Sequence, residues 1–518
     1  MPARSGVLSL GVFLIVLTVY AIAGPGRIDI IDGQYRFEVA KNMIEDRSIQ
    51  IMDPFLSFGA QGIDGVYSPY GISGSIVALP LVALGSLGSP SVDRQQFFFS
   101  FTSAVLGAAT AVVLFLFYLR LGVSPRSALA WTLVAAFATL AFPAATSVFD
   151  QTQHGFFVLT ACMLAFLAAR EESTRLAIAG GLILAILVNF QETYVILFPG
   201  LALATLAPPD ADPDARRRSR ERYVAFILVG CLGVLFWMGL NNFRFGRLLY
   251  SRDPGNHPSV VGNPLLGLAG LLLSPGKSIF LYSPPTAAAL IGVYHLFRRE
   301  RMLATAIAIT CLAYLALISS VSFYGGDWCW GPRYFASILP LLALGFPFLN
   351  LATRAERFAL RTLIAAGIVV QLMAISVDHH RFFYARSLPA FFWYRNDAFY
   401  YRQSALFARP REIVDTITRG VPPEAKAFRP GPHPDLLTYA IFGGWGRPEL
   451  PLPIWMRHYT VFWLPRPWPL WMATIPPDRR PIDVRAGLGL LIAGAFAGMI
   501  AIRYGCRPEE VKERSMSA

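Results

Sequence analysis

Two carboxylates near the N-terminus are the first residues whose type and position could support chemistry. Asp29 and Asp32 lie in "RIDIIDGQYRFEVAKNMIED", directly after an apolar run. A carboxylate at a membrane edge is reached by water and can take a proton from an attacking hydroxyl group. Aspartate is equally a common N-cap residue, and three residues along one face predict an amphipathic helix here: Tyr35, Val39 and Met43. This stretch alone leaves helix capping and catalysis open.

Two later stretches each combine a helix-breaking backbone with a single cation. "LLLSPGKSIFLYSPP" carries Lys277 between two Ser-Pro pairs, and "SFYGGDWCWGPRYF" carries Arg333 among glycines. Lysine, arginine and the N–H groups of such turns can hold a phosphate group. Trp328 and Trp330 are suited to stacking on a sugar ring. The alternative for both stretches is an interfacial loop, with the cations extended to water and the tryptophans in an aromatic belt.

A third group of polar residues lies between apolar runs. "SVFDQTQHGFF" places Asp150 and His154 four residues apart, and "NFQETY" contains Glu192. An acid and an imidazole at this spacing can share a divalent metal ion or a proton. Such a pair is also found in ordinary polar loops, so the sequence makes no cofactor certain.

The composition indicates that a membrane-embedded scaffold positions these residues. Of the 518 residues, 55% are hydrophobic and only 15% are charged, with a mean hydropathy of +0.49. So few charges cannot cover the surface of a soluble protein of this length. The net charge of +13 is spread over short clusters between apolar runs, which excludes a nucleic-acid-binding face. The five cysteines fit neither a zinc site nor a disulfide framework.

The apolar runs predict an all-α polytopic membrane protein. About twelve runs approach the roughly 20 residues that cross a bilayer. They are 7–24, 95–119, 128–146, 155–169, 176–190, 192–207, 223–241, 284–297, 302–320, 334–350, 361–377 and 486–502. The shorter apolar stretch 73–88 is predicted to be a helix lying at the interface.

Arginine and lysine set the predicted orientation. With the N-terminus inside, the basic loops at 120–126, 170–175, 216–222, 298–301 and 354–361 and the basic C-terminal tail all fall on the cytoplasmic side. Both termini are then cytoplasmic, and the large segments 25–94, 242–283, 321–333 and 378–485 face outward. No Walker or dinucleotide motif lies in the inner loops.

Three parts follow from this topology. Residues 1–377 form a transmembrane core that includes the first outer loop, 25–94. Residues 378–485 form an outer segment or small cap domain, in which "PLPIWMRHYTVFWLPRPWPLWM" is typical of an interfacial aromatic belt. Residues 486–518 form the last span and a cytoplasmic tail.

The order of the motifs resembles a known superfamily. Asp32-Gly33-x-Tyr35 is followed by "YSPYGISGSIVALP", then by "SPGKSIFLYSP" and "WCWGPRYF". Over about residues 7–380 the chain resembles the GT-C superfamily of integral-membrane glycosyltransferases. Its N-terminal part is similar to the branch of aminoarabinose transferases and protein O-mannosyltransferases.

This resemblance implies a mechanism and a set of site residues. The donor would be a sugar on a polyprenyl phosphate, and Asp32, with Asp29 as second candidate, would be the general base on the acceptor hydroxyl. Cations would receive the leaving phosphate: Lys277, Arg333 and Arg36. Aromatic residues would bind the substrates: Tyr35, Tyr67, Tyr70, Trp328 and Trp330.

The chain also departs from that branch. Gln34-Tyr35-Arg36 replaces part of its D-E-x-R-Y motif, and Ser68-Pro69-Tyr70 replaces its K-P-P-L segment without the lysine. The donor phosphate must therefore be held differently, or the donor itself differs. Aminoarabinose transfer to lipid A is not the activity that these residues favour.

The preferred hypothesis is an inverting glycosyltransferase in the cytoplasmic membrane, multi-pass, with an active site that faces outward. Its acceptor would be a cell-envelope glycan, lipid or protein. A transporter or flippase of lipid-linked glycans is the second hypothesis, because about twelve spans also fit that class. A non-catalytic membrane protein of envelope assembly is the third, because the K-P-P-L lysine is missing.

Overall fold

The computed structural model describes residues 2–28, 30–51, 60–88, 91–249, 261–326, 329–384, 399, 404–420, 463–474 and 476–506. Seven helical stretches are long and apolar enough to cross a membrane. They are α1 (Pro2–Ala23), α4 with α5 (Val92–Phe99 and Thr102–Arg120), α8 (Gln151–Arg170), α11 (Pro213–Phe245), α15 (Arg301–Ser319), α17 (Arg354–Ser376) and α23 (Val484–Gly505). The protein is thus an all-α polytopic membrane protein, as its apolar runs predict.

The other predicted spans are shorter or broken helices. They are α6 (Pro125–Phe137) with α7 (Ala141–Ala145), α9 (Thr174–Val188), η2 to η3 (Glu192–Thr205, including α10, Phe198–Ala202), α14 (Thr286–Phe297), and η4 (Arg333–Ser337) followed by α16 (Leu339–Ala343) and η5 (Phe346–Phe348). Proline explains several of the breaks, because it lacks the N–H that a continuing helix needs. Pro199 and Pro340 each stand in the first turn of a new short helix.

The segment predicted to be the first outer loop contains a small subdomain. It contains α2 (Ile31–Glu45), β1 (Gln50–Ile51), β2 (Ala60–Gln61), β3 (Val66–Tyr67) and α3 (Ser73–Ser86). The strands form an antiparallel sheet in the order β1-β3-β2, with Ile51 opposite Val66. Tyr35 and Val39 of α2 are buried against these two residues. This packing confirms the predicted amphipathic face, and the tiny sheet is an addition to the predicted helices.

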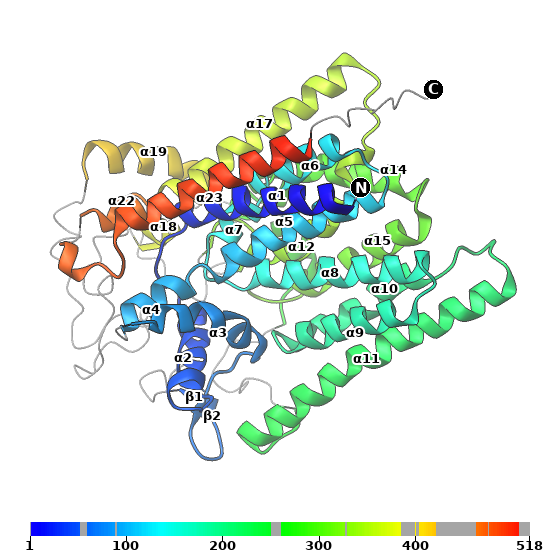
Figure 1. Cartoon of the computed structure of the whole chain (residues 1–518), viewed down its shortest axis with the longest axis horizontal. Helices are drawn as coiled ribbons and strands as arrows, with labels where there is room; N and C mark the ends of the chain where they lie inside the picture. The colour runs from blue at the N-terminus through cyan, green and yellow to red at the C-terminus, as the bar shows by residue number, and fades with distance from the viewer. Residues whose placement is uncertain are drawn as a thin grey trace, which may run out of the picture.

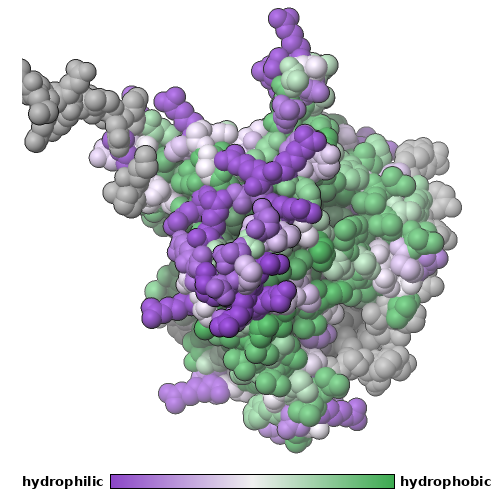
Figure 2. Space-filling model, turned by 90° about the vertical axis from the view of Figure 1, so that its right-hand side faces the viewer, coloured by the Kyte–Doolittle hydropathy of each residue, from purple (hydrophilic) through white to green (hydrophobic). Residues whose placement is uncertain are grey.

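The two ends of the helix bundle differ in what they carry (Figure 1). The start of α1 and the end of α23 lie at one end, whereas α2, α3, α4, α18 (His379–Tyr384), α19 (Ala405–Thr418) and α22 (Trp468–Met472) gather toward the other. At the end with the termini, Arg120 lies 3.4 Å from Glu171 and Arg170 pairs with Glu300. Figure 2, which views that end, shows hydrophilic residues gathered there and hydrophobic residues along its flanks. The loops that carry Arg120 and Arg170 therefore lie at this end, and the orientation of the bundle across a membrane stays a prediction.

The described part of segment 378–485 packs on the ends of α1 and α17. The indole N–H groups of Trp468 and Trp471 donate to the carbonyls of Ala21 (2.9 Å) and Pro25 (2.8 Å). Both rings are buried, so these two tryptophans anchor the segment to the core and are not part of an interfacial belt. The first part of the predicted belt, 451–462, lies outside the described residues. The helices that the structure describes in this segment are short: α18, α19, α22 and η9 (Pro477–Arg479).

A fully buried ion pair ties this segment to the N-terminal span. Arg27 Nη2 lies 2.5 Å from Asp378 Oδ2, and neither side chain is exposed. The Arg27 guanidinium also lies 5.2 Å from the Trp471 ring centroid. Removing one partner of such a pair leaves an uncompensated buried charge, at a cost of about 3–5 kcal/mol.

We expect Asp378→Asn to lower the thermal unfolding midpoint of the detergent-solubilised protein markedly, because Arg27 loses its counter-charge. A thiol-reactive dye can follow unfolding through Cys162, which is buried. Glu171→Gln is the matched control: it removes an exposed partner and should leave the midpoint nearly unchanged. The double change Arg27→Met with Asp378→Leu should recover part of the loss, and an unshifted midpoint in Asp378→Asn would contradict this account.

Candidate active site

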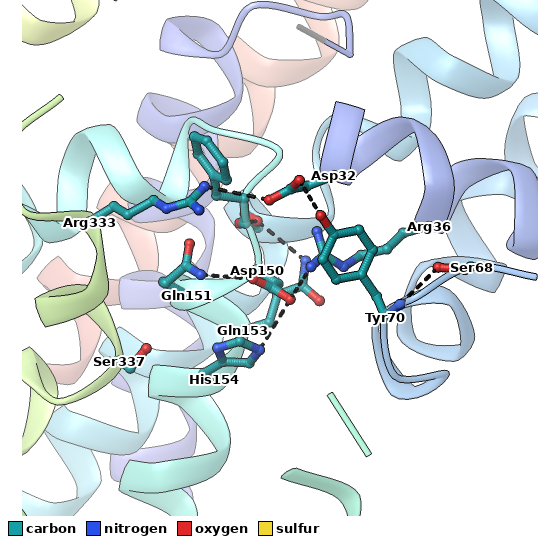
Figure 3. A network of polar contacts seen from close by, with 12 residues as sticks. Asp32, Arg36, Ser68, Tyr70, Asp150, Gln151, Gln153, His154, Arg333 and Ser337 are labelled. Carbon is teal, nitrogen blue, oxygen red and sulfur yellow. Dashed lines mark hydrogen bonds and ion pairs between the residues drawn. The ribbon is translucent and has the colours of Figure 1, made fainter. Parts of the chain in front are cut away.

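Asp32 lies in the first turn of α2 and faces two side chains from distant parts of the chain (Figure 3). The Tyr70 hydroxyl donates to Asp32 Oδ1 at 2.5 Å. Arg333 Nη1 lies 3.6 Å from Asp32 Oδ2, and the Asp32 side chain is 18% exposed. The N-cap of α2 is Ile30, which has no side-chain capping bond. Asp32 is therefore not the capping residue of this helix, and its carboxylate belongs to a polar site that solvent reaches.

Gly33 allows α2 to approach the turn before α8. A Cβ at Gly33 would lie 2.8 Å from Cγ2 of Val148, closer than real Cβ contacts allow. The glycine next to Asp32 is thus required for packing, which brings the first turn of α2 against the residues that precede Asp150.

The position of Tyr70 is fixed by hydrogen bonds to the backbone around it. Arg244, near the end of α11, donates from Nη1 to the carbonyls of Ser68 (3.1 Å) and Tyr70 (3.2 Å). The Ser73 N–H donates to the carbonyl of Asn189, 3.0 Å away. These bonds fix the turn before α3, so the tyrosine hydroxyl points toward Asp32. The sequence analysis missed Arg244, whose only signal is a charge near the end of an apolar run.

Arg333 starts the short helix η4, and its stem passes over Gly326. Gly326 has a φ of +76°, and a Cβ there would lie 2.6 Å from Arg333 Cγ. The guanidinium carbon lies 3.8 Å from the centroid of the Phe149 ring, a cation–π contact. Arg333 also donates to the Tyr334 hydroxyl at 3.4 Å. The glycines of this loop thus serve to place the cation beside Asp32.

A second charged group lies beneath Asp32. Arg36 Nη2 lies 2.6 Å from Asp150 Oδ2, both about 5% exposed, and His154 Nε2 lies 3.2 Å from the same oxygen. Burial alone would raise the pKa of Asp150, but Arg36, His154 and Arg333 hold that pKa well below its ordinary value. Arg36 also lies over the Tyr70 ring, 4.5 Å from its centroid. The two charged groups are therefore joined through Tyr70.

His154 continues the network into the helix bundle. Its Nδ1 lies 2.7 Å from the Tyr194 hydroxyl, which in turn lies 2.7 Å from Ser337 Oγ and 3.1 Å from the Tyr314 hydroxyl. All four side chains are buried. The sequence analysis singled out Glu192 instead, but Glu192 is exposed. Tyr194, two residues further along η2, is the one that points inward.

Other predicted site residues lie elsewhere. Lys277 is buried, and its Nζ donates to the carbonyls of Cys329 (3.2 Å) and Gly331 (3.1 Å), so it supports the loop that leads to Arg333. Tyr35 and Tyr67 are buried in the first subdomain, where the Tyr67 hydroxyl donates to Asp64. Asp29 and Trp328 lie outside the described residues.

Trp330 lies beside the site but is buried. It lines a small cavity of about 30 Å³ together with Arg333, His379 and Arg466. A space of this size admits about one water molecule. Trp330 therefore borders Arg333 from inside the protein.

Within the part of the chain that the structure describes, no three His, Cys, Asp or Glu side chains group closely enough to hold a metal ion. Asp150 and His154 do meet, as their spacing predicts, but Arg36 is the cation beside them. Glu192 does not join them. A divalent metal at this pair stays a prediction.

No family model matches the chain, and no curated protein matches it either. Among solved structures, the chain is similar to the Archaeoglobus fulgidus oligosaccharyltransferase in the apo form, with 12% identity over 71% of this chain and 56% of that one, at a TM-score of 0.45. It is also similar to archaeal AglB from the same organism in complex with an inhibitory peptide and a dolichol-phosphate, with 12% identity and a TM-score of 0.46 over the same shares. A third is ArnT from Cupriavidus metallidurans bound to undecaprenyl phosphate, with 15% identity over 82% of this chain and 81% of that one, at a TM-score of 0.49.

Two of these solved structures are of an archaeal oligosaccharyltransferase, and the third is of ArnT. The chain spans little more than half the length, 56%, of the archaeal enzymes. At these identities and scores, neither an activity nor any site residue is carried over from them, and the function is argued from the residues of this chain.

The lowered pKa of Asp150 predicts how stability depends on pH. Because the folded-state pKa is depressed, the pair with Arg36 stabilises fully above the unfolded-state pKa, about 3.9, and this contribution is lost as the pH falls below it. We expect Asp150→Asn to lower the unfolding midpoint by a constant amount between about pH 5 and pH 8. The difference in unfolding midpoint between wild type and Asp150→Asn should become smaller below about pH 4. Asp46→Asn, at the exposed end of α2, is the control, and a gap that widens in acid would contradict the assignment.

Proposed function

We propose that this chain is an inverting glycosyltransferase that moves a sugar from a polyprenyl-phosphate-type lipid to an acceptor hydroxyl, with Asp32 as general base. The observation that carries the proposal is the meeting of a solvent-reached carboxylate with Arg333 at one end of a membrane bundle, 3.6 Å apart. A base and a phosphate-binding cation side by side are what such a displacement needs.

The proposed step is a single displacement. The acceptor oxygen forms a bond with the anomeric carbon while its proton passes to the Asp32 carboxylate. The bond between the anomeric carbon and the phosphate oxygen breaks, and the polyprenyl phosphate leaves with the bonding electrons. One displacement at this carbon inverts its configuration.

The side chains around Asp32 have different roles in this step. Tyr70 occupies Asp32 Oδ1, which leaves Oδ2 toward the acceptor. Arg333 rests on the Phe149 ring and lies 3.6 Å from Asp32, so its guanidinium stands beside the proposed base. Arg36 is committed to Asp150, and Lys277 to backbone carbonyls. Of the three cations named from the sequence, we assign the donor phosphate to Arg333, because its guanidinium lies beside Asp32.

The orientation belongs to the same proposal. The arginine distribution along the chain supports cytoplasmic termini in an inner membrane, with the Asp32 end facing outward. Membrane lipids surround the bundle, and the acceptor is a glycan, lipid or protein of the cell envelope. These assignments rest on charge placement and site chemistry.

The test is Asp32→Asn in purified protein reconstituted in nanodiscs. Undecaprenyl-phosphate-linked hexoses and pentoses are supplied one at a time with an envelope extract as acceptor, and the release of undecaprenyl phosphate is followed by mass spectrometry. We expect wild type to release it with one donor and Asp32→Asn to be slower by about 10²–10⁴-fold, because the base is lost. Asp46→Asn, on the same helix, should keep full activity.

Two outcomes would point to the other hypotheses. Movement of a labelled donor across the bilayer of reconstituted vesicles, without release of undecaprenyl phosphate, would indicate a flippase. Absence of both release and donor binding would indicate a non-catalytic protein of envelope assembly. Full activity in correctly inserted Asp32→Asn would remove Asp32 as the base.

A further inference from the structure

The contacts around the site, together with the short helix η4, form a closed set of connections, of which Figure 3 shows the part from Arg333 through Asp32 and Asp150 to His154. Its members belong to five separate parts of the chain, and each is connected to the next through its side chain or through η4. We call this set the site ring: Asp32, Tyr70, Arg36, Asp150, His154, Tyr194, Ser337 and Arg333.

One arm of the site ring runs from His154 to Asp32. His154 contacts Asp150, Asp150 pairs with Arg36 at 2.6 Å, and Arg36 lies under the Tyr70 ring. Tyr70 then donates to Asp32. This arm sets the direction of the carboxylate.

The other arm runs from His154 to Arg333. The Tyr194 hydroxyl bridges His154 Nδ1 and Ser337 Oγ, 2.7 Å from each. Ser337 ends the same five-residue helix η4 that Arg333 begins. This arm therefore fixes the short helix that carries the cation.

His154 is the member that joins the two arms, and it lies fully buried in α8. Because Nε2 faces a carboxylate oxygen, we assign the ring proton to Nε2, which leaves Nδ1 to accept from Tyr194. The imidazole thus lies between the Asp150 carboxylate, 3.2 Å from Nε2, and the Tyr194 hydroxyl, 2.7 Å from Nδ1. An ionisable side chain buried inside a membrane bundle is commonly functional.

We propose that His154 is a positioning residue that holds Asp32 and Arg333 in register with each other. It touches neither the reacting atoms nor the donor, and acts through Asp150 on one side and Tyr194 on the other. Its effect on the rate rests on the proposed transferase function. Its effect on the geometry of the site does not.

The kinetic test uses three variants: His154→Ala, His154→Gln and Tyr194→Phe. A small misplacement of reacting groups can slow catalysis by about 10²-fold, so we expect His154→Ala to lower kcat by about that factor, with KM changed less than about 3-fold. His154→Gln, which keeps a donor and an acceptor, should recover part of kcat. Tyr194→Phe should add little to His154→Ala, because both changes cut the same connection.

The second test needs no substrate. Asp32 and His154 are connected through Tyr70, Arg36 and Asp150, so the site ring predicts that their effects on stability are coupled. The midpoint shift of Asp32→Asn with His154→Ala should differ from the sum of the two single shifts, whereas Asp46→Asn with His154→Ala should be additive.

The two tests separate the possible failures. Coupled shifts with no transfer by wild type would overturn the proposed function and leave the site ring standing. Normal transfer with additive shifts and an unchanged kcat in His154→Ala would overturn the positioning role and leave the function standing. A rise in KM alone would also overturn it, because a positioning residue acts on kcat.

Discussion

The buried ion pair between Arg36 and Asp150 is the interaction on which the site depends. It joins the first outer segment to the helix bundle at 2.6 Å, in a place where both side chains are almost free of solvent. Two charges at that depth cost free energy unless further polar groups satisfy them. For Asp150, the further stabilising groups are His154 and Arg333. For Arg36, it is the ring of Tyr70, which lies against the guanidinium. The pair therefore brings α2, α8 and η4 to one point, which is where Asp32 and Arg333 meet.

A second fully buried pair performs the same task for the late part of the chain. Arg27, just after α1, pairs with Asp378. The residue before Asp378, Val377, forms a β-bridge with Pro465. The tryptophans of α22 then donate to carbonyls at the end of α1. Segments separated by several hundred residues are held together by a few desolvated polar contacts, while apolar side chains fill the space between the helices. The site lies between these two attachments.

The sequence predicted the helices better than it predicted the contacts between them. Apolar runs are a direct physical requirement of a bilayer, so the full-length spans could be predicted, whereas prolines such as Pro199 and Pro340 divide runs that look continuous. Asp32 and Arg333 stood out because charge is rare beside apolar runs. Asp150 and His154 stood out by their spacing, which gave no sign that Arg36 would join them.

Other members of the site could not be found in this way. Tyr194 and Ser337 are single polar residues inside apolar stretches, and only the tertiary fold shows that they meet 2.7 Å apart. Lys277 has the residue type of a phosphate ligand, but its ammonium is directed at the carbonyls of Cys329 and Gly331.

An experimental structure of the protein in nanodiscs with undecaprenyl phosphate tests the central claim most directly. The account predicts a phosphate oxygen about 3 Å from the Arg333 guanidinium, on the side facing Asp32. A phosphate bound elsewhere, with Arg333 still resting on Phe149 and Asp32, would contradict it.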